Sequence, residues 1–243
     1  MIKIGLFGGT FNPVHNAHLR AAVEIRDIFR LDAVEFIPAA LPPHKNSREL
    51  ATPEMRVEMI RLAVSGKNGL SVSDVELMRS GRSFTVDTLE SYRKRYCGNA
   101  MLFFIIGLDA FLDIHTWKSH EALFRMASFI VMTRPNAFSA GIADNSGNDN
   151  RKTRDMSFSV ISDYVKKHIS VDYEVINASE TEMVAPAPVN FSHPTLHPVY
   201  FQPITALDIS ASEIRRLVRE RRSISYLTPE VVETFILSKG LYV

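Results

Sequence analysis

The fold of this chain is decided by the stretch Gly8-Gly9-Thr10-Phe11-Asn12-Pro13-Val14-His15-Asn16-Ala17-His18-Leu19. The largely apolar run before it, 2–7, predicts a buried strand. The residues after it, 19–29, repeat apolar side chains at helical spacing and predict an amphipathic helix. The stretch is therefore a strand-to-helix turn at the carboxyl end of a first strand, which is where open α/β sheets bind ligands.

This turn carries groups that suit a phosphate. Gly8 and Gly9 let the backbone approach an anion closely. The helix start offers unpaired N–H groups and the positive end of a dipole. His15 and His18 share one face if both lie in the first helical turn, and an imidazole can donate a hydrogen bond to a phosphoryl oxygen. The sequence thus predicts a phosphate site built from one continuous segment.

The H-x-x-H pair has two other interpretations. With 8 histidines in 243 residues, such a pair arises by chance in roughly one chain in four, and an isolated pair usually lies on the surface. A zinc site is the second alternative, but no Glu follows His15 and the chain has no cysteine cluster. The strand, glycines and helix around the pair favour phosphate.

The composition sets broad limits on the protein class. A chain of 243 residues, 46% of them hydrophobic and 23% charged, suits one globular domain with a sizeable core. The net charge of +1 argues against a protein that binds nucleic acid by bulk electrostatics. The single cysteine, Cys97, fits a reducing cytoplasm and is expected to be at least half-buried. We expect no signal peptide and no membrane span.

Strand and helix patterns alternate along the chain, which predicts a doubly wound (Rossmann-like) α/β fold with a parallel sheet and a small C-terminal helical region. We expect a single domain over 1–243, a mobile insertion at 136–155, an extended or loop segment at 185–198, and C-terminal helices within 210–243. Further strands are expected at 33–38, 70–75, 101–106 and 129–132. Further helices are expected at 52–66, 85–96, 119–126, 158–169, 212–221 and 229–238.

A second candidate phosphate site opens the penultimate helix, at Ile209-Ser210-Ala211-Ser212-Glu213-Ile214-Arg215. Serines at a helix start are usually caps, and an arginine one turn later is usually solvated. Those interpretations explain each residue type but not the concentration of hydroxyls, N–H groups and a guanidinium at one helix start, which suits phosphate.

Both stretches resemble signatures of the nucleotidyltransferase superfamily. The first resembles G-G-[ST]-F-[DN]-P-x-H-x-[GA]-H, whose usual form ends H-x-G-H, so Ala17 stands where glycine is usual. The second resembles I-S-x-[ST]-x-x-R, which in that superfamily binds the phosphates of ATP. The resemblance also covers Gly107-Leu108-Asp109, which in that family contacts the adenosine portion and would otherwise be a strand end with an Asp helix cap. It implies ATP binding by Gly8, Gly9, Thr10, Phe11, Gly107, Asp109, Ser210 and Ser212.

Three further stretches resemble one branch, the nicotinate mononucleotide adenylyltransferases. They are Pro42-Pro43-His44-Lys45, the segment 83–89, and Thr116-Trp117. By default the first is an exposed turn and Trp117 a core anchor. The resemblance implies that Trp117 stacks on the pyridine ring of the acceptor, that backbone N–H groups near Thr85 and Trp117 receive its carboxylate, and that His44 lies at the acceptor.

The resemblance implies transfer of AMP from ATP to nicotinate mononucleotide, giving nicotinate adenine dinucleotide and pyrophosphate in NAD biosynthesis. The acceptor phosphate is already a nucleophile at neutral pH, so the enzyme needs no protein base and must only align the reactants and absorb charge. The implied charge-stabilising residues are His15, His18, Lys45 and Arg215, with Mg²⁺ held mainly by the phosphates and no protein metal ligand.

Several alternatives stay open from the sequence. The same fold can serve another acceptor, such as nicotinamide mononucleotide or phosphopantetheine, or a cytidylyl donor. A non-catalytic nucleotide-binding regulator has Ala17 as its sole support, and an H-x-x-H metal hydrolase is a further alternative. The expected partners are ATP and nicotinate mononucleotide in the cytoplasm, with no nucleic acid and no membrane. The sequence leaves open whether the chain forms a homo-oligomer.

Overall fold

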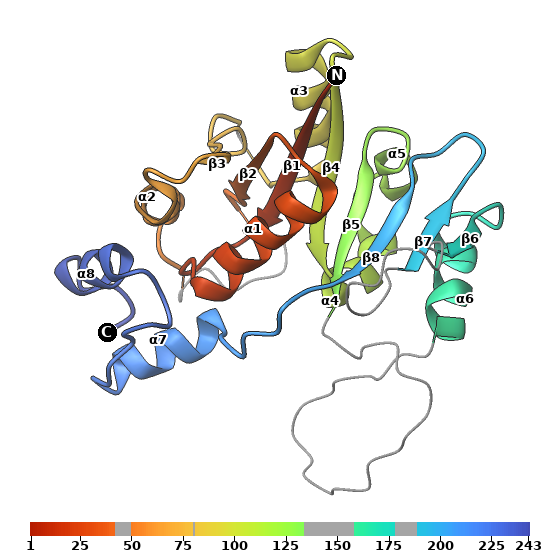
Figure 1. The fold of residues 1–243 in the computed structure, drawn as a ribbon. Helices are drawn as coiled ribbons and strands as arrows, with labels where there is room; N and C mark the ends of the chain where they lie inside the picture. The colour runs from red at the N-terminus through yellow and green to blue at the C-terminus, as the bar shows by residue number, and fades with distance from the viewer. Residues whose placement is uncertain (42–49, 80, 134–157, 178–188) are drawn as a thin grey trace, which may run out of the picture.

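The computed structural model describes residues 1–41, 50–79, 81–133, 158–177 and 189–243 (Figure 1). Three predictions from the sequence lie outside the described residues. They are the two site residues His44 and Lys45 and the insertion at 136–155.

Within the described residues, one sheet of eight strands runs in the order β3-β2-β1-β4-β5-β8-β7-β6. Its parallel part consists of β1 (Ile2–Gly9), β2 (Ala33–Pro38), β3 (Leu70–Val72), β4 (Ala100–Gly107), β5 (Ser128–Thr133) and β8 (Val199–Pro203). Two strands, β6 (Glu174–Asn177) and β7 (Val189–Ser192), add to one edge by antiparallel pairing. The sheet is therefore mostly parallel rather than wholly parallel.

Helices cover both faces of this sheet, as the doubly wound prediction requires (Figure 1). One face carries α1 (Asn16–Phe29), α2 (Pro53–Val64), α7 (Ala211–Arg219) and α8 (Glu230–Ser238). The other carries α3 (Thr85–Tyr96), α4 (Leu108–Leu112), α5 (His120–Leu123) and α6 (Phe158–His168), with a 3₁₀ turn η2 (Ile114–Thr116). Successive residues of β4 alternate between the two cores: Phe104 packs under α3 and α4, whereas Phe103 and Ile105 face α1.

Some sequence predictions of local structure were wrong. The strand predicted at 70–75 ends at Val72, and the helix predicted at 119–126 ends at Leu123, after which i→i−3 bonds complete the turn. The segment 185–198 contains β7, whose antiparallel pairing with β6 and β8 no local pattern indicated. Cys97 is exposed rather than buried, because it caps the end of α3 with a left-handed backbone at φ 45°.

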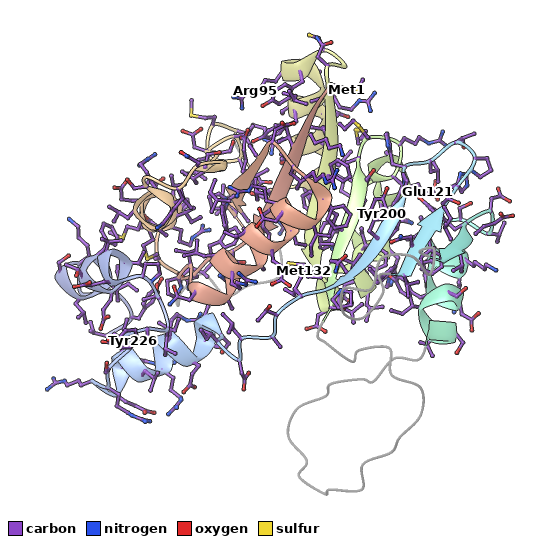
Figure 2. The ribbon with its side chains drawn as sticks, in the orientation of Figure 1. Met1, Arg95, Glu121, Met132, Tyr200 and Tyr226 are labelled. Carbon is purple, nitrogen blue, oxygen red and sulfur yellow. The ribbon has the colours of Figure 1, made fainter. Side chains whose placement is uncertain are left out.

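The carboxyl ends of the parallel strands meet at one edge of the sheet. Figure 2 labels Met132 near the end of β5 at this edge, with Met1 and Arg95 at the opposite end of the sheet. The chain runs from β1 outward to β2 and β3, then returns to place β4 on the other side of β1. A crevice at the carboxyl ends of β1 and β4 therefore lies at the topological switch point, where such sheets bind ligands. Within the described parts of the chain, no helix is long and apolar enough to cross a membrane.

Candidate active site

The turn after β1 is shaped by contacts that its two glycines permit. A Cβ on Gly8 would lie 2.8 Å from Cζ of Phe104, and a Cβ on Gly9 would lie 2.8 Å from Cζ of Phe11. Phe11 itself is buried and has a left-handed backbone, with φ 50°. The glycines are thus required for ring packing beneath the turn, in addition to the close approach of an anion that the sequence predicts.

The rings of the two histidines are in contact, but only His18 lies within the helix; His15 precedes it. Because α1 begins at Asn16, His15 is the N-cap residue with an extended backbone and His18 is the third helical residue. Their rings stack with centroids 3.7 Å apart. The backbone N–H of His15 donates to Nδ1 of His18 at 3.3 Å. A neutral His18 therefore carries its proton on Nε2, which makes that nitrogen the hydrogen-bond donor of the ring.

His15 is buried and neutral at physiological pH. Only 5% of its surface is exposed, and burial lowers its pKa from 6.5 to about 4. Its Nδ1 is buried and has no hydrogen-bond partner among the described residues. A buried polar atom of this kind, at a helix N-terminus beside a glycine turn, is well suited to a ligand group.

The lowered pKa of His15 predicts a pH-dependent stability. Between pH 6.5 and about pH 4 the unfolded chain binds this proton and the folded protein does not, so stability falls as pH falls through that window. The loss for this one group is about 3 kcal/mol. Urea unfolding at pH 4.5 and 7.5 should show a smaller loss for His15→Asn than for the unsubstituted protein. Equal losses would mean that His15 is not buried as a neutral group.

The second phosphate stretch lies against the first. Ser210 caps α7, its Oγ accepting the N–H of Glu213 at 3.2 Å and lying 3.2 Å from Oγ of Ser212. Arg215 Nη1 donates to the backbone oxygen of Asn12 at 2.9 Å, across 203 residues of sequence. The structure thus brings together the two stretches that the sequence predicts to bind phosphate.

Asn12 is a junction that sequence analysis missed. It is 3% exposed, and its Oδ1 accepts the N–H of Ala51 at 2.9 Å and the hydroxyl of Tyr242 at 2.8 Å. Nothing in the local sequence marks Tyr242 or Ala51 as neighbours of the glycine turn. The turn is therefore held by α7, by the segment before α2 and by the residues after α8.

A cavity of about 440 Å³ opens beside the turn, at the carboxyl ends of β1 and β4. Half-buried Trp117 stands at its wall with its ring edge-to-face with Phe104, centroids 6.3 Å apart. Six residues predicted from the sequence line this cavity: Gly8, Gly9, Thr10, Thr85, Gly107 and Trp117. Charged lining residues that the sequence analysis missed are Glu76, Arg82 and Lys118.

The two expected N–H donors in the cavity differ. Thr85 is the first residue of α3, so its N–H has no partner within the helix and lies at the positive helix end. The N–H of Trp117 donates to the carbonyl of Ile114 at 2.9 Å and is not available to a ligand. Lys118 also lines the cavity, and its Nζ lies 3.0 Å from Asp87 Oδ1 and 4.8 Å from the centre of the Phe84 ring.

The other predicted residues that the structure describes lie outside the cavity wall. One of them is Asp109, which is exposed. It is not the helix cap that the sequence suggested, because Gly107 is the N-cap of α4. His15, His18, Phe11, Arg215, Ser210 and Ser212 likewise belong to the turn and to α7 rather than to the cavity lining. In the part of the chain that the structure describes, no group of three or more His, Cys, Asp or Glu side chains could hold a metal ion.

Residues 6–217 match the family model described as cytidylyltransferase-like. The chain is 40% identical over 244 residues to the probable nicotinate-nucleotide adenylyltransferase of Desulfatibacillum aliphaticivorans, covering 99% of this chain and 100% of the relative. It is 39% identical over 242 residues to the protein of the same name from Citrifermentans bemidjiense, covering 100% of this chain and 99% of the relative.

The fold is similar to that of solved structures. Plasmodium falciparum nicotinic acid mononucleotide adenylyltransferase complexed with NaAD aligns with a TM-score of 0.66 at 18% identity, covering 100% of this chain and 98% of that one. The same enzyme complexed with APC aligns with a TM-score of 0.63 at 17% identity, with the same coverage. At such identities the likeness concerns the fold alone.

Proposed function

The chain belongs to the cytidylyltransferase-like family and, within it, to the nicotinate-nucleotide adenylyltransferases, and from this membership we propose how its residues carry out the reaction. The reaction transfers AMP from ATP to nicotinate mononucleotide, forming nicotinate adenine dinucleotide and pyrophosphate in NAD biosynthesis. The family predicted from the two signatures is confirmed.

The roles are assigned from one observation: two half-sites join at a single turn. One half-site is the cavity, and the other is the phosphate site formed by His15, His18 and the start of α7. One end of the turn, at Gly8, Gly9 and Thr10, lines the cavity, and the other end leads to His15 and His18. Arg215 is bonded to Asn12 in the middle of the same turn. This arrangement supports an acceptor in the cavity and a triphosphate over the start of α1, with the reacting phosphates meeting at the turn.

In the chemical step, an oxygen of the acceptor phosphate attacks the α-phosphorus of ATP. The bond from that phosphorus to the α–β bridging oxygen breaks, and pyrophosphate leaves. We assign stabilisation of the developing charge to His15, His18 and Arg215, and also to Lys45, which lies outside the described residues. The acceptor phosphate is anionic at neutral pH, so no residue has to act as a base.

The remaining roles divide between the two substrates. Ser210 and Ser212 bind the triphosphate at the start of α7, and the turn from Gly8 to Phe11 lies against its phosphates. Gly107, at the edge of the cavity that it also lines, contacts the adenosine portion together with Asp109. Thr85 and Trp117 hold the pyridine ring and its carboxylate, and His44 is assigned to the acceptor from the sequence alone. The chain acts as a single domain over 1–243, supported by the packing of α7 and α8 into the same core as α1 and α2.

Nucleotidyl transfer from ATP generally uses a divalent metal, and we propose Mg²⁺ as that ion. The side chains at the phosphate turn are imidazoles and a guanidinium, which suit phosphate oxygens rather than Mg²⁺. This donor set fits an ion that arrives bound to the triphosphate, and its chemistry there would be to neutralise phosphate charge. The single cysteine supports a reducing cytoplasm as the place of action.

Release of pyrophosphate from ATP with a panel of acceptors tests this function. A carboxylate carries a full negative charge and accepts hydrogen bonds only, so the Thr85 N–H at the positive end of α3 favours it over a neutral amide, whose carbonyl could accept the same bond without that charge. We expect kcat/KM for nicotinate mononucleotide to exceed that for nicotinamide mononucleotide by about tenfold or more. Phosphopantetheine as acceptor and CTP as donor should give no product. Equal use of the acid and the amide would contradict the assignment of Thr85 and Trp117.

A further inference from the structure

Arg56 is a buried cation that none of the roles above uses. It lies in the first turns of α2 with 1% of its surface exposed. Among the described residues, its guanidinium donates to backbone carbonyls only: Nε to Ala51 at 3.1 Å, Nη1 to Thr10 at 2.9 Å and to Ala39 at 2.7 Å, and Nη2 to Ala40 at 3.1 Å. No carboxylate pairs with it within the described residues. A buried charge without a counter-ion is costly, so this arrangement needs a compensating benefit.

The carbonyls that Arg56 binds belong to both half-sites. Thr10 is in the phosphate turn, whereas Ala39 and Ala40 follow β2 at the acceptor cavity, which Thr10 and Ala39 both line. Ala51 accepts from Arg56 through its carbonyl and donates its own N–H to Oδ1 of Asn12. One rigid, planar group thus joins the turn to the wall of the cavity and to the segment before α2.

The bond to Thr10 also sets the direction of the next N–H group. The peptide between Thr10 and Phe11 is trans, so its N–H points away from its carbonyl oxygen. With that oxygen held by Arg56, the Phe11 N–H points away from the guanidinium, and it has no hydrogen-bond partner within the described residues. An N–H left without such a partner suits an anion bound at the turn.

We propose that Arg56 is a positioning residue for the transfer reaction, which holds the phosphate turn in register with the acceptor cavity and orients the Phe11 N–H. The proposal rests on the proposed function, because the relative position of the turn and the cavity affects the rate only when both substrates are bound together. Its signature is a fall in kcat with little change in the KM of either substrate, since each half-site keeps its own contacts while their relative placement loosens.

The test compares Arg56→Lys with Arg61→Lys. Arg61 lies on the same helix but is exposed and pairs with Glu58, so it controls for the substitution itself. A lysine at position 56 keeps the charge but offers three donors on one atom in place of the planar fork. The fraction of competent enzyme is measured by calorimetric titration with a non-hydrolysable ATP analogue, and kcat is expressed per binding site.

For Arg56→Lys we expect kcat per competent site to fall about tenfold, with both KM values within about threefold of the unsubstituted enzyme, and no change for Arg61→Lys. Unchanged kcat per competent site, or a defect confined to the KM of one substrate, would overturn the proposal. Arg56→Met, which leaves buried carbonyls unpaired, should lower the midpoint of thermal unfolding far more than Arg56→Lys. If the unsubstituted enzyme forms no dinucleotide, the proposed function is rejected. The titration would then still show whether Arg56→Lys changes the affinity for the ATP analogue.

Discussion

Replacing His18 by Ala is expected to lower kcat about 10²-fold or more. The ring is oriented by its stacking on His15 and by the His15 N–H that binds its Nδ1, so Nε2 is the donor to charge that develops on the phosphates. Loss of one pre-oriented donor of this kind typically costs a factor of 10² to 10³, or roughly 3–4 kcal/mol. Steady-state kinetics at saturating ATP and acceptor measures the effect.

The fold should survive this substitution. His18 is half-buried, and its ring meets Phe7 and Phe11 at centroid distances of 6.1 and 5.0 Å, so the free energy of unfolding should fall by only about 1 kcal/mol. His168→Ala, at the end of α6 on the opposite face of the sheet, is a matched control and should retain full activity. Near-normal turnover by His18→Ala would remove this residue from the mechanism.

Replacing Trp117 by Ala is expected to raise the KM for nicotinate mononucleotide by about tenfold to a hundredfold, and to leave the KM for ATP almost unchanged. Trp117 lines the cavity, whereas the residues assigned to the triphosphate lie at the turn and at α7. Stacking of an aromatic side chain on a ring is worth roughly 1–3 kcal/mol, by analogy with base stacking, and that range sets the expected change.

Measuring both KM values on both proteins tests the division of the site into two halves. Trp117→Phe keeps an aromatic face against Phe104 and should lose much less affinity for the acceptor than Trp117→Ala. A rise in the KM for ATP, with the KM for the acceptor unchanged, would falsify the assignment of this cavity to the acceptor.

The sequence predicted the features whose physical cause is local. Alternating strand and helix patterns led to a doubly wound sheet, because each element's apolar period reports which of its faces is buried. It missed β6 and β8 and described β7 only as extended or loop, because strands of four or five residues gain their stability from pairing rather than from a strong pattern. The same reasoning selected His15, His18, Ser210 and Arg215 as candidate site residues, because each lies in a compact motif at a helix start.

The sequence by itself determined that a glycine turn joins the first strand to the first helix, and that a second candidate phosphate motif opens the penultimate helix. Backbone geometry and helix dipoles act over a few residues, so these features can be recognised without knowledge of the rest of the chain. Only the tertiary structure decided that Arg215 and Tyr242 hold Asn12 and that Arg56 joins the turn to the wall of the cavity. These bonds join segments far apart in the chain, and the packing of helices on the sheet brings them together at distances that no local pattern encodes.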